Sequence, residues 1–158
     1  MSRSPIRVVL ADDHAVVRAG LRAVLGVARD IEVVGEAEDG REAVALAERL
    51  APDVVVMDLT MEPMGGAEAT AEIVARGLPT RVLILTVHAE EDYLMPLLEA
   101  GAAGYLVKSA ADRELVEAVR AAARGDVYLK APAARVLAGA LSQRARAGPG
   151  RELGSTSA

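Results

Sequence analysis

The chain has 158 residues, of which 52% are hydrophobic and 26% are charged, so we expect most of it to fold around a core of its own. It contains no cysteine, which excludes disulfides, thiolate metal sites and cysteine nucleophiles. Its only aromatic residues are three tyrosines and its net charge is −5, which argues against a platform for stacking nucleic-acid bases.

Charge is unevenly divided along the chain. Residues 1–124 carry 13 basic and 21 acidic side chains, a balance of −8, whereas residues 125–158 carry 5 and 2, a balance of +3. Because phosphate contacts need clustered Lys and Arg, we expect no nucleic acid to be bound by this chain itself. The sequence has no secretory leader pattern and no apolar run of 18 residues, so we expect no membrane association and a cytoplasmic location.

Five short apolar runs are predicted to be strands. They are rich in β-branched residues and show no polar alternation, which is typical of parallel strands covered by helices on both faces. The runs are residues 6–11, 32–35, 54–57, 82–85 and 105–107.

Five amphipathic segments alternate with these strands, at residues 17–28, 43–50, 66–76, 94–101 and 115–123. A capping box formed by Asp39 and Glu42 is predicted to open the second helix, and Ser109 or Asp112 to cap the fifth. In the third helix, Ile73 and Val74 are expected to face inward. Alternating strand and helix units of this length predict a doubly wound α/β sheet.

The C-terminal part of the chain has a different character. A sixth amphipathic helix is predicted at about residues 132–141, and the residues beyond it are polar, glycine-rich and aperiodic, as disordered tails are. We therefore divide the chain into a main domain at 5–124, a linker with a helix at 125–145 and a disordered tail at 146–158.

Polar side chains stand where four of the predicted strands end. They are Asp12 and Asp13, Asp58, Thr86, and Lys108. The carboxyl ends of parallel strands lie along one edge of a sheet, where ligands bind. An isolated aspartate at such a place is more often a helix cap than a ligand, but the whole set predicts one shared site.

The composition of this set indicates phosphoryl transfer. Three neighbouring carboxylates stay ionised only with a compensating cation, and oxygen ligands without His or Cys suit Mg²⁺. Lys108 adds a compact positive charge and Thr86 a hydroxyl donor. A metal, an ammonium group and a hydroxyl around one carboxylate make a phosphoryl-transfer site, with Asp58 as the nucleophile. The alternative is a structural acidic pocket of helix caps and a salt bridge.

These residues and the strings ADDHAVVRAGL, GEAEDGREAV, VVVMDL, LILTVHAEEDYL and EAGAAGYLVKSA resemble the receiver domains of two-component response regulators, in particular the NarL/FixJ (LuxR-type) subfamily. The resemblance covers about residues 5–124. It implies the flavodoxin-like (CheY-like) fold, with five parallel strands in the order 2-1-3-4-5 followed here by a C-terminal linker helix.

The resemblance also implies the chemistry of the site. Asp58 would accept a phosphoryl group from a sensor histidine kinase. Asp13, Asp58 and the backbone carbonyl of Thr60 would ligate Mg²⁺, and Asp12 would act through water. The domain would be a phosphoacceptor signalling module rather than an enzyme, although it would assist its own Mg²⁺-dependent phosphorylation and dephosphorylation.

A switch is implied as well. Lys108 would pair with the phosphoryl group, Thr86 would move toward it, and the Tyr105 ring would swing inward. The surface of the fourth helix, fifth strand and fifth helix would then change shape, control an output such as transcription, and offer a face for a homodimer.

Several features depart from the family pattern or stay open. Glu62 stands where the family usually has proline, and Pro63 follows it; we expect Glu62 to point to solvent. Pro96 predicts either a kinked fourth helix or one that begins late. His14 is expected to open the first helix rather than bind metal, and His88 to border the phosphoryl group.

The tail raises the question of output. The subfamily continues into a helix-turn-helix domain, for which the last residues are too few. Since the sixth helix resembles the linker to that domain, we favour a truncated or degenerate transcription regulator over a naturally output-less receiver.

Three other functions compete with a phosphoacceptor receiver. A pseudo-receiver that binds partners without phosphorylation stays open because of Glu62. A haloacid-dehalogenase-type phosphatase needs an acid two residues after its nucleophile, where this chain has Thr60. A nucleotide-binding flavodoxin-like protein needs a glycine-rich phosphate loop after the first strand, which is missing.

Overall fold

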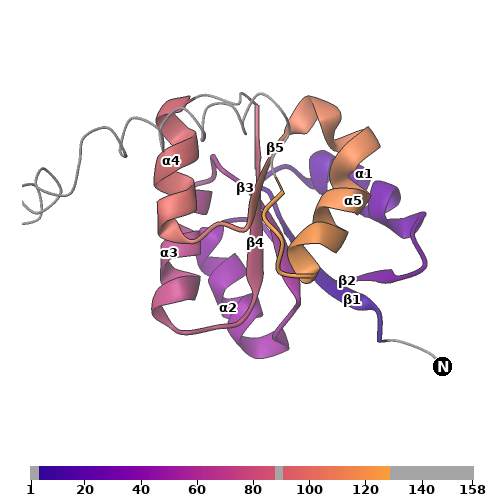
Figure 1. Cartoon of the computed structure of the whole chain (residues 1–158), viewed down its shortest axis with the longest axis horizontal. Helices are drawn as coiled ribbons and strands as arrows, with labels where there is room; N and C mark the ends of the chain where they lie inside the picture. Colours follow the sequence, from indigo (N-terminus) through magenta and orange to yellow (C-terminus); the bar gives the residue numbers. More distant parts are fainter. Residues whose placement is uncertain (1–3, 88–90, 129–158) are drawn as a thin grey trace, which may run out of the picture.

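A computed structural model of the chain describes residues 4–87 and 91–128. Its centre is one parallel sheet of five strands in the order β2-β1-β3-β4-β5, seen nearly edge-on in Figure 1. The strands are β1 (Ile6–Ala11), β2 (Ile31–Ala37), β3 (Val54–Asp58), β4 (Arg81–Thr86) and β5 (Gly104–Val107). The predicted fold class and the strand order implied by the resemblance are both confirmed.

Helices cover both faces of the sheet. They are α1 (Ala15–Gly26), α2 (Gly40–Leu50), α3 (Gly66–Ala75), α4 (Glu91–Ala100) and α5 (Ala111–Ala123), the last preceded by a short 3₁₀ helix at Lys108–Ala110. Helices α1 and α5 lie on one face, and α2, α3 and α4 on the other (Figure 1).

Two hydrophobic cores lie between these layers. Successive strand residues alternate between them: Val9 and Val55 join the core under α2–α4, while Val8 and Val54 join the core under α1 and α5. Because helices cover both faces of the sheet, the strand residues that point to either face are apolar. This arrangement explains the unbroken apolar runs in the sequence.

Strand β2 is longer than the apolar run that predicted it. It extends to Ile31–Ala37 and adds Glu36 to the Glu32 that the run already contained. It lies at one edge of the sheet, and its inner residues are partly exposed or exposed rather than buried. An edge strand can carry such charged residues because one side is open to water.

Two predicted helix caps are wrong in detail. The Asp39 side chain accepts from the Glu42 N–H at 2.9 Å, but the Glu42 carboxylate accepts from Glu38 N–H at 2.7 Å instead of closing the box on Asp39. Neither Ser109 nor Asp112 caps α5, because the 3₁₀ turn runs directly into it and makes Ala110 the cap residue, without a side-chain hydrogen bond.

Two expectations about α3 and α4 also fail. Val74 is 52% exposed, whereas Ile73 is fully buried, since adjacent helix positions are about 100° apart and only one faces the sheet. Pro96 lies inside α4, which already begins at Glu91, so the late helix start is wrong.

The segment after α5 returns to the sheet, which the sequence did not indicate. Tyr128 forms a parallel bridge with Gly104 at the outer edge of β5. Its N–H donates to the Ala103 carbonyl at 3.1 Å, and its carbonyl accepts from the Tyr105 N–H at 3.1 Å. Tyr128, the last residue that the structure describes, therefore lies beside β5.

The remaining predictions concern other parts of the chain. The linker helix at 132–141, the disordered tail at 146–158 and His88 lie outside the described residues, so the proposed division into domains stays a prediction. Within the described residues, no helix is long and apolar enough to cross a membrane.

Candidate functional site

The polar residues predicted at the strand ends are brought together by the sheet. Asp12 follows β1, Asp58 ends β3, Thr86 ends β4 and Lys108 follows β5. Asp12 is fully buried, while Asp58 and Thr86 are 5% and 6% exposed. The predicted convergence at one edge is confirmed for these residues.

Lys108 is the centre of the cluster. Its Nζ lies 3.0 Å from Asp12 Oδ2 and 3.3 Å from Asp58 Oδ2. Burial lowers the pKa of Lys108, but the hydrogen bond to Asp12 and the charges of Asp58 and Asp12 outweigh burial and hold the pKa above its ordinary value. The ammonium group therefore stays charged between two buried carboxylates.

Asp58 is not fully stabilised as an anion. Burial is the main cause that raises its pKa above the ordinary value, Lys108 opposes this, and the charge of Asp12 raises the pKa further. Its Oδ1 accepts from the Thr60 N–H at 3.3 Å. The site thus contains a buried carboxylate whose charge is only partly compensated by its neighbours.

The backbone around Asp58 is tightly packed. A Cβ added to Gly66 would lie 2.5 Å from the Asp58 carbonyl oxygen, closer than atoms approach without a shift. The Gly66 N–H donates to the Leu59 carbonyl at 2.9 Å, and the Leu59 N–H to the Leu85 carbonyl at 2.8 Å. Glycine at this position therefore lets α3 begin directly beside β3.

Asp13 and His14 lie at the outer side of the cluster. Asp13 is exposed, and its Oδ1 is 2.9 Å from His14 Nδ1, which is also 3.3 Å from Asp12 Oδ1. One ligand atom from each of Asp12, Asp13 and His14 lies within 4.8 Å of the others. His14 occupies the cap position of α1 without a side-chain capping bond, so it opens this helix as predicted.

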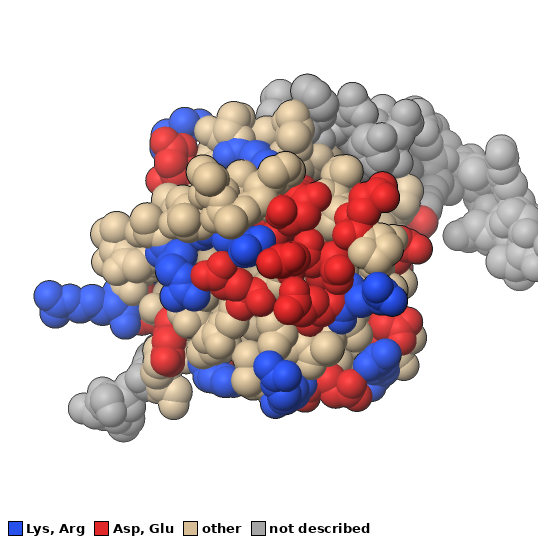
Figure 2. Space-filling view, turned by 180° about the vertical axis from the view of Figure 1, so that it is seen from behind, with Lys and Arg blue, Asp and Glu red and all other residues tan. Residues whose placement is uncertain are grey.

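The donor set fits a magnesium ion. Carboxylate oxygens are the hard ligands that Mg²⁺ takes. Those of Asp12 and Asp13 lie in one group, and those of Asp12 and Asp58 share Lys108 as a partner. Acidic side chains also gather in the middle of the face shown in Figure 2, and such a field concentrates cations. The ligand set of Asp13, Asp58 and the Thr60 carbonyl, with Asp12 through water, remains a prediction.

The two residues of the implied switch belong to adjacent strands. Thr86 pairs with Val107, and Tyr105 pairs with Ile84, two positions before Thr86. Tyr105 is 2% exposed and packs in the core under α2–α4. Side chains two positions apart on a strand share a face, so Thr86 and Tyr105 point to the same side of the sheet.

A hollow of about 650 Å³ opens beside this edge. Thr60, Glu62, Thr86 and Val87 are among the residues that line it. Glu62 is exposed, as the sequence favoured. The hollow gives a partner or small molecule access to the neighbourhood of Asp58.

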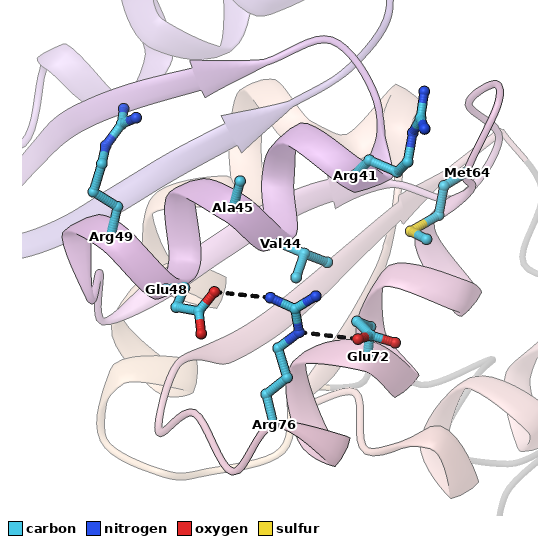
Figure 3. Close-up of a pocket in the computed structure, with 8 residues that line it drawn as sticks. All are labelled: Arg41, Val44, Ala45, Glu48, Arg49, Met64, Glu72 and Arg76. Carbon is cyan, nitrogen blue, oxygen red and sulfur yellow. Dashed lines mark hydrogen bonds and ion pairs between the residues drawn. The ribbon is translucent and has the colours of Figure 1, made fainter.

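A second hollow, of about 530 Å³, lies between α2 and α3 (Figure 3). Arg76 crosses it and pairs with Glu48 at 2.8 Å and Glu72 at 2.9 Å. The residues that line it include no Asp, His, Ser, Thr or Lys, and its two carboxylates are paired with Arg76. The strand-end cluster of Asp12, Asp58, Thr86 and Lys108 is therefore the candidate functional site.

Comparison with known proteins identifies the family. The response regulator receiver domain matches residues 8–120, which is most of the chain. The chain belongs to this family. The sequence-based identification of a receiver domain is thereby confirmed.

Relatives of this receiver domain are transcriptional regulators of the NarL/LuxR type. Transcriptional regulatory protein LiaR of Bacillus subtilis (strain 168) is 46% identical over 129 residues, which cover 82% of this chain and 61% of LiaR. This chain thus spans about three fifths of the length of such curated relatives.

Solved structures of response regulators share the fold of this chain. A LuxR-family two-component response regulator from Aurantimonas sp. SI85-9A1 is 38% identical, with a TM-score of 0.81 over 88% of this chain and 99% of that one. The receiver domain of the response regulator NarL from Mycobacterium tuberculosis is 39% identical, with a TM-score of 0.76 over 78% of this chain and 99% of that one.

Sequence reasoning missed one residue that contacts the site. Arg18 on α1 donates to the backbone carbonyl of Asp12. Arg18 stands at helical spacing from Leu21 and Leu25, which are buried. A charged residue on the apolar face of a helix was the available signal.

Proposed function

We propose that this receiver domain accepts a phosphoryl group on Asp58 from the phosphohistidine of a sensor histidine kinase. Mg²⁺ would bind among the carboxylates of Asp12, Asp13 and Asp58, which we call the acidic cluster. The observation that carries the proposal is the contact of Lys108 Nζ with both Asp12 Oδ2 and Asp58 Oδ2 at the carboxyl ends of the strands. Receiver-family membership supports the same chemistry.

The transfer is a displacement at phosphorus. A carboxylate oxygen of Asp58 forms the new P–O bond while the P–N bond of the donor breaks, and the electron pair stays on the imidazole nitrogen. The raised pKa of Asp58 supports its role, because a poorly stabilised carboxylate is a better nucleophile. Lys108 is placed to pair with the phosphoryl oxygens that arrive.

Asp13, Asp58 and the Thr60 carbonyl would hold the metal ion, and Asp12 would act on it through water. When bound, Mg²⁺ supplies positive charge that offsets the phosphoryl oxygens. The buried position of Asp12 keeps its carboxylate facing Lys108, and this contact orients the ammonium group.

The output would follow from the charge that the phosphoryl group adds, about −1.5 to −2 with three acceptors. The Thr86 hydroxyl would donate to a phosphoryl oxygen, and the Tyr105 ring would occupy the space beside it. We propose that the face of α4, β5 and α5 then changes shape to control transcription and forms the homodimer contact. The regulatory names of the relatives support this output.

The test is the intact mass of the chain after incubation with Mg²⁺ and a small acyl-phosphate donor. We expect a gain of one phosphoryl group that disappears in Asp58→Asn and without Mg²⁺. Asp112→Asn is the matched control, because Asp112 is 72% exposed on α5, and it should label like wild type.

A gain that persists in Asp58→Asn would overturn the assignment of the acceptor. The absence of any gain in folded wild type, repeated with a phosphorylated histidine kinase as donor, would favour a pseudo-receiver that binds partners without phosphorylation.

A further inference from the structure

Arg18 is a partly buried cation beside the acidic cluster. It lies on α1, and its side chain is only 12% exposed, in contrast to Arg22 one turn later, which is 51% exposed. A guanidinium group loses hydration when it is withdrawn from water, so it is expected to have specific acceptors. The acceptors of Arg18 connect three segments of the chain.

The contacts of Arg18 run from α1 to the ends of β1 and β2. Its Nη1 donates to the Asp12 backbone carbonyl at 2.5 Å, and its Nε donates to Glu36 Oε1 at 2.9 Å. Its Nη2 is 4.0 Å from Glu38 Oε2. The planar guanidinium group is thus fixed by Glu36 of β2, and it holds the backbone that follows β1 in place.

The carbonyl that Arg18 holds belongs to the peptide between Asp12 and Asp13. The N–H of Asp12 is also fixed, because it donates to the Ala37 carbonyl of β2 at 3.0 Å. Asp12 Oδ1 accepts from the His14 N–H at 2.9 Å. Together with these bonds, the contact of Arg18 fixes the orientation of the Asp12–Asp13 peptide, and with it the relative placement of the two aspartates.

We propose that Arg18 is a positioning residue that sets the Mg²⁺ affinity of the site by holding the peptide between Asp12 and Asp13. This inference rests on the proposed function, since it concerns the same metal site. Arg18 touches neither the metal nor the phosphoryl group; it acts through the backbone of the two aspartates.

Positioning and charge predict opposite results when Arg18 is replaced. Loss of a cation near carboxylates tightens the binding of another cation. Loss of a residue that orients metal ligands weakens binding, typically about 10–100-fold. Arg18 pairs with Glu36, which it shares with Arg22, and faces Glu38. These two carboxylates offset part of its charge, so we expect the loss of positioning to dominate.

The experiment is isothermal titration calorimetry of the full chain with Mg²⁺, without any phosphodonor. Arg18→Met is expected to weaken Mg²⁺ binding at least about 10-fold. Arg22→Met is the matched control: Arg22 lies on the same helix, and its Nε donates to the same Glu36 carboxylate at 2.7 Å. The Arg22→Met substitution removes the same charge without removing a contact to Asp12. The Mg²⁺ affinity of this variant should therefore stay within about twofold of wild type.

Stability is controlled separately. Each variant is titrated well below its Tm, as measured by circular dichroism. Arg18→Lys is the second variant, because it keeps the charge but lacks the fork that spans both acceptors; we expect it to weaken binding at least about threefold.

Unchanged or tighter Mg²⁺ binding by folded Arg18→Met or Arg18→Lys would overturn the inference, and so would equal weakening by Arg22→Met. Failure of the proposed function gives a different result, since phosphorylation would then be absent or independent of Asp58, whatever the Mg²⁺ affinity of the Arg18 variants.

Discussion

At the scale of single residues, the site is arranged for chemistry at a cost in stability. Asp58 is buried beside Asp12, and its pKa is raised despite the nearby Lys108. The folded chain therefore holds the Asp58 proton more tightly than the unfolded chain does. Stability is lost as the pH rises from the ordinary pKa of an aspartate through the raised value.

Asp58→Asn is accordingly expected to stabilise the fold at neutral pH, because it removes this poorly compensated charge. The Tm should rise by a few degrees, since roughly 1 kcal/mol corresponds to about 2–4 °C for a chain of this size. Thermal melts at pH 7 and at pH 3 provide the measurement, and the gain should shrink at the lower pH, where wild-type Asp58 is itself protonated. A Tm below that of wild type at pH 7 would contradict this view of the site.

Tyr128 gives a prediction about pH. Burial, with the charge of Glu114 next, raises the pKa of Tyr128 to about 12, and its hydroxyl donates to Glu114 Oε1 at 3.2 Å. The stability that follows is present below the ordinary tyrosine pKa and lost as the pH rises toward about 12. When tyrosinate formation is followed by absorbance, one ionisation step should occur at high pH, and Tyr128→Phe should remove this step. If Tyr128→Phe removes an ionisation step at lower pH instead, the assignment is refuted.

At the scale of elements, burial rather than surface charge holds the helices on the sheet. Ile73 of α3 is fully buried, whereas Arg76, Glu48 and Glu72 form an exposed network between α2 and α3 (Figure 3). Exposed ion pairs contribute little to stability, because water and salt screen them. Loss of the buried contact should therefore lower the free energy of unfolding more than loss of the exposed ion pairs.

Ile73→Ala is expected to lower the free energy of unfolding by about 2–5 kcal/mol. Arg76→Met should lower it by less than about 1 kcal/mol. Urea denaturation of both variants beside wild type makes the comparison, and a larger loss in the arginine variant would show that the ion-pair network dominates.

The elements also show what the sequence could and could not predict. The runs at β3 and β4 were recognised because strands buried on both faces are apolar throughout, and the site followed because parallel strands end at one edge. The bridge of Tyr128 to β5 and the contact of Arg18 with Asp12 were not predictable, since each depends on one residue that meets a distant segment. The Val74 prediction failed because adjacent helix positions point about 100° apart. The α5-cap prediction failed because the 3₁₀ turn runs directly into the helix.

At the scale of the whole molecule, one sheet carries both the site residues at its strand ends and Tyr105 on its edge strand β5. Asp12, Asp58 and Lys108 meet at the strand ends, and Tyr105 extends from β5 into the core between sheet and helices. Tyr128 lies beside β5 and bonds to the backbone of Tyr105 itself. The described part of the chain thus ends in contact with the strand that carries Tyr105.

The central claim is that Asp58 is the phosphoacceptor, and chemical mapping of the modified residue tests it most directly. Borohydride reduces an aspartyl phosphate to homoserine, so the chain is phosphorylated with Mg²⁺ and a small acyl phosphate, reduced, digested and sequenced by mass spectrometry. We predict homoserine at position 58 and an unaltered aspartate at positions 12 and 13. Homoserine at another position, with residue 58 unaltered, would contradict the account.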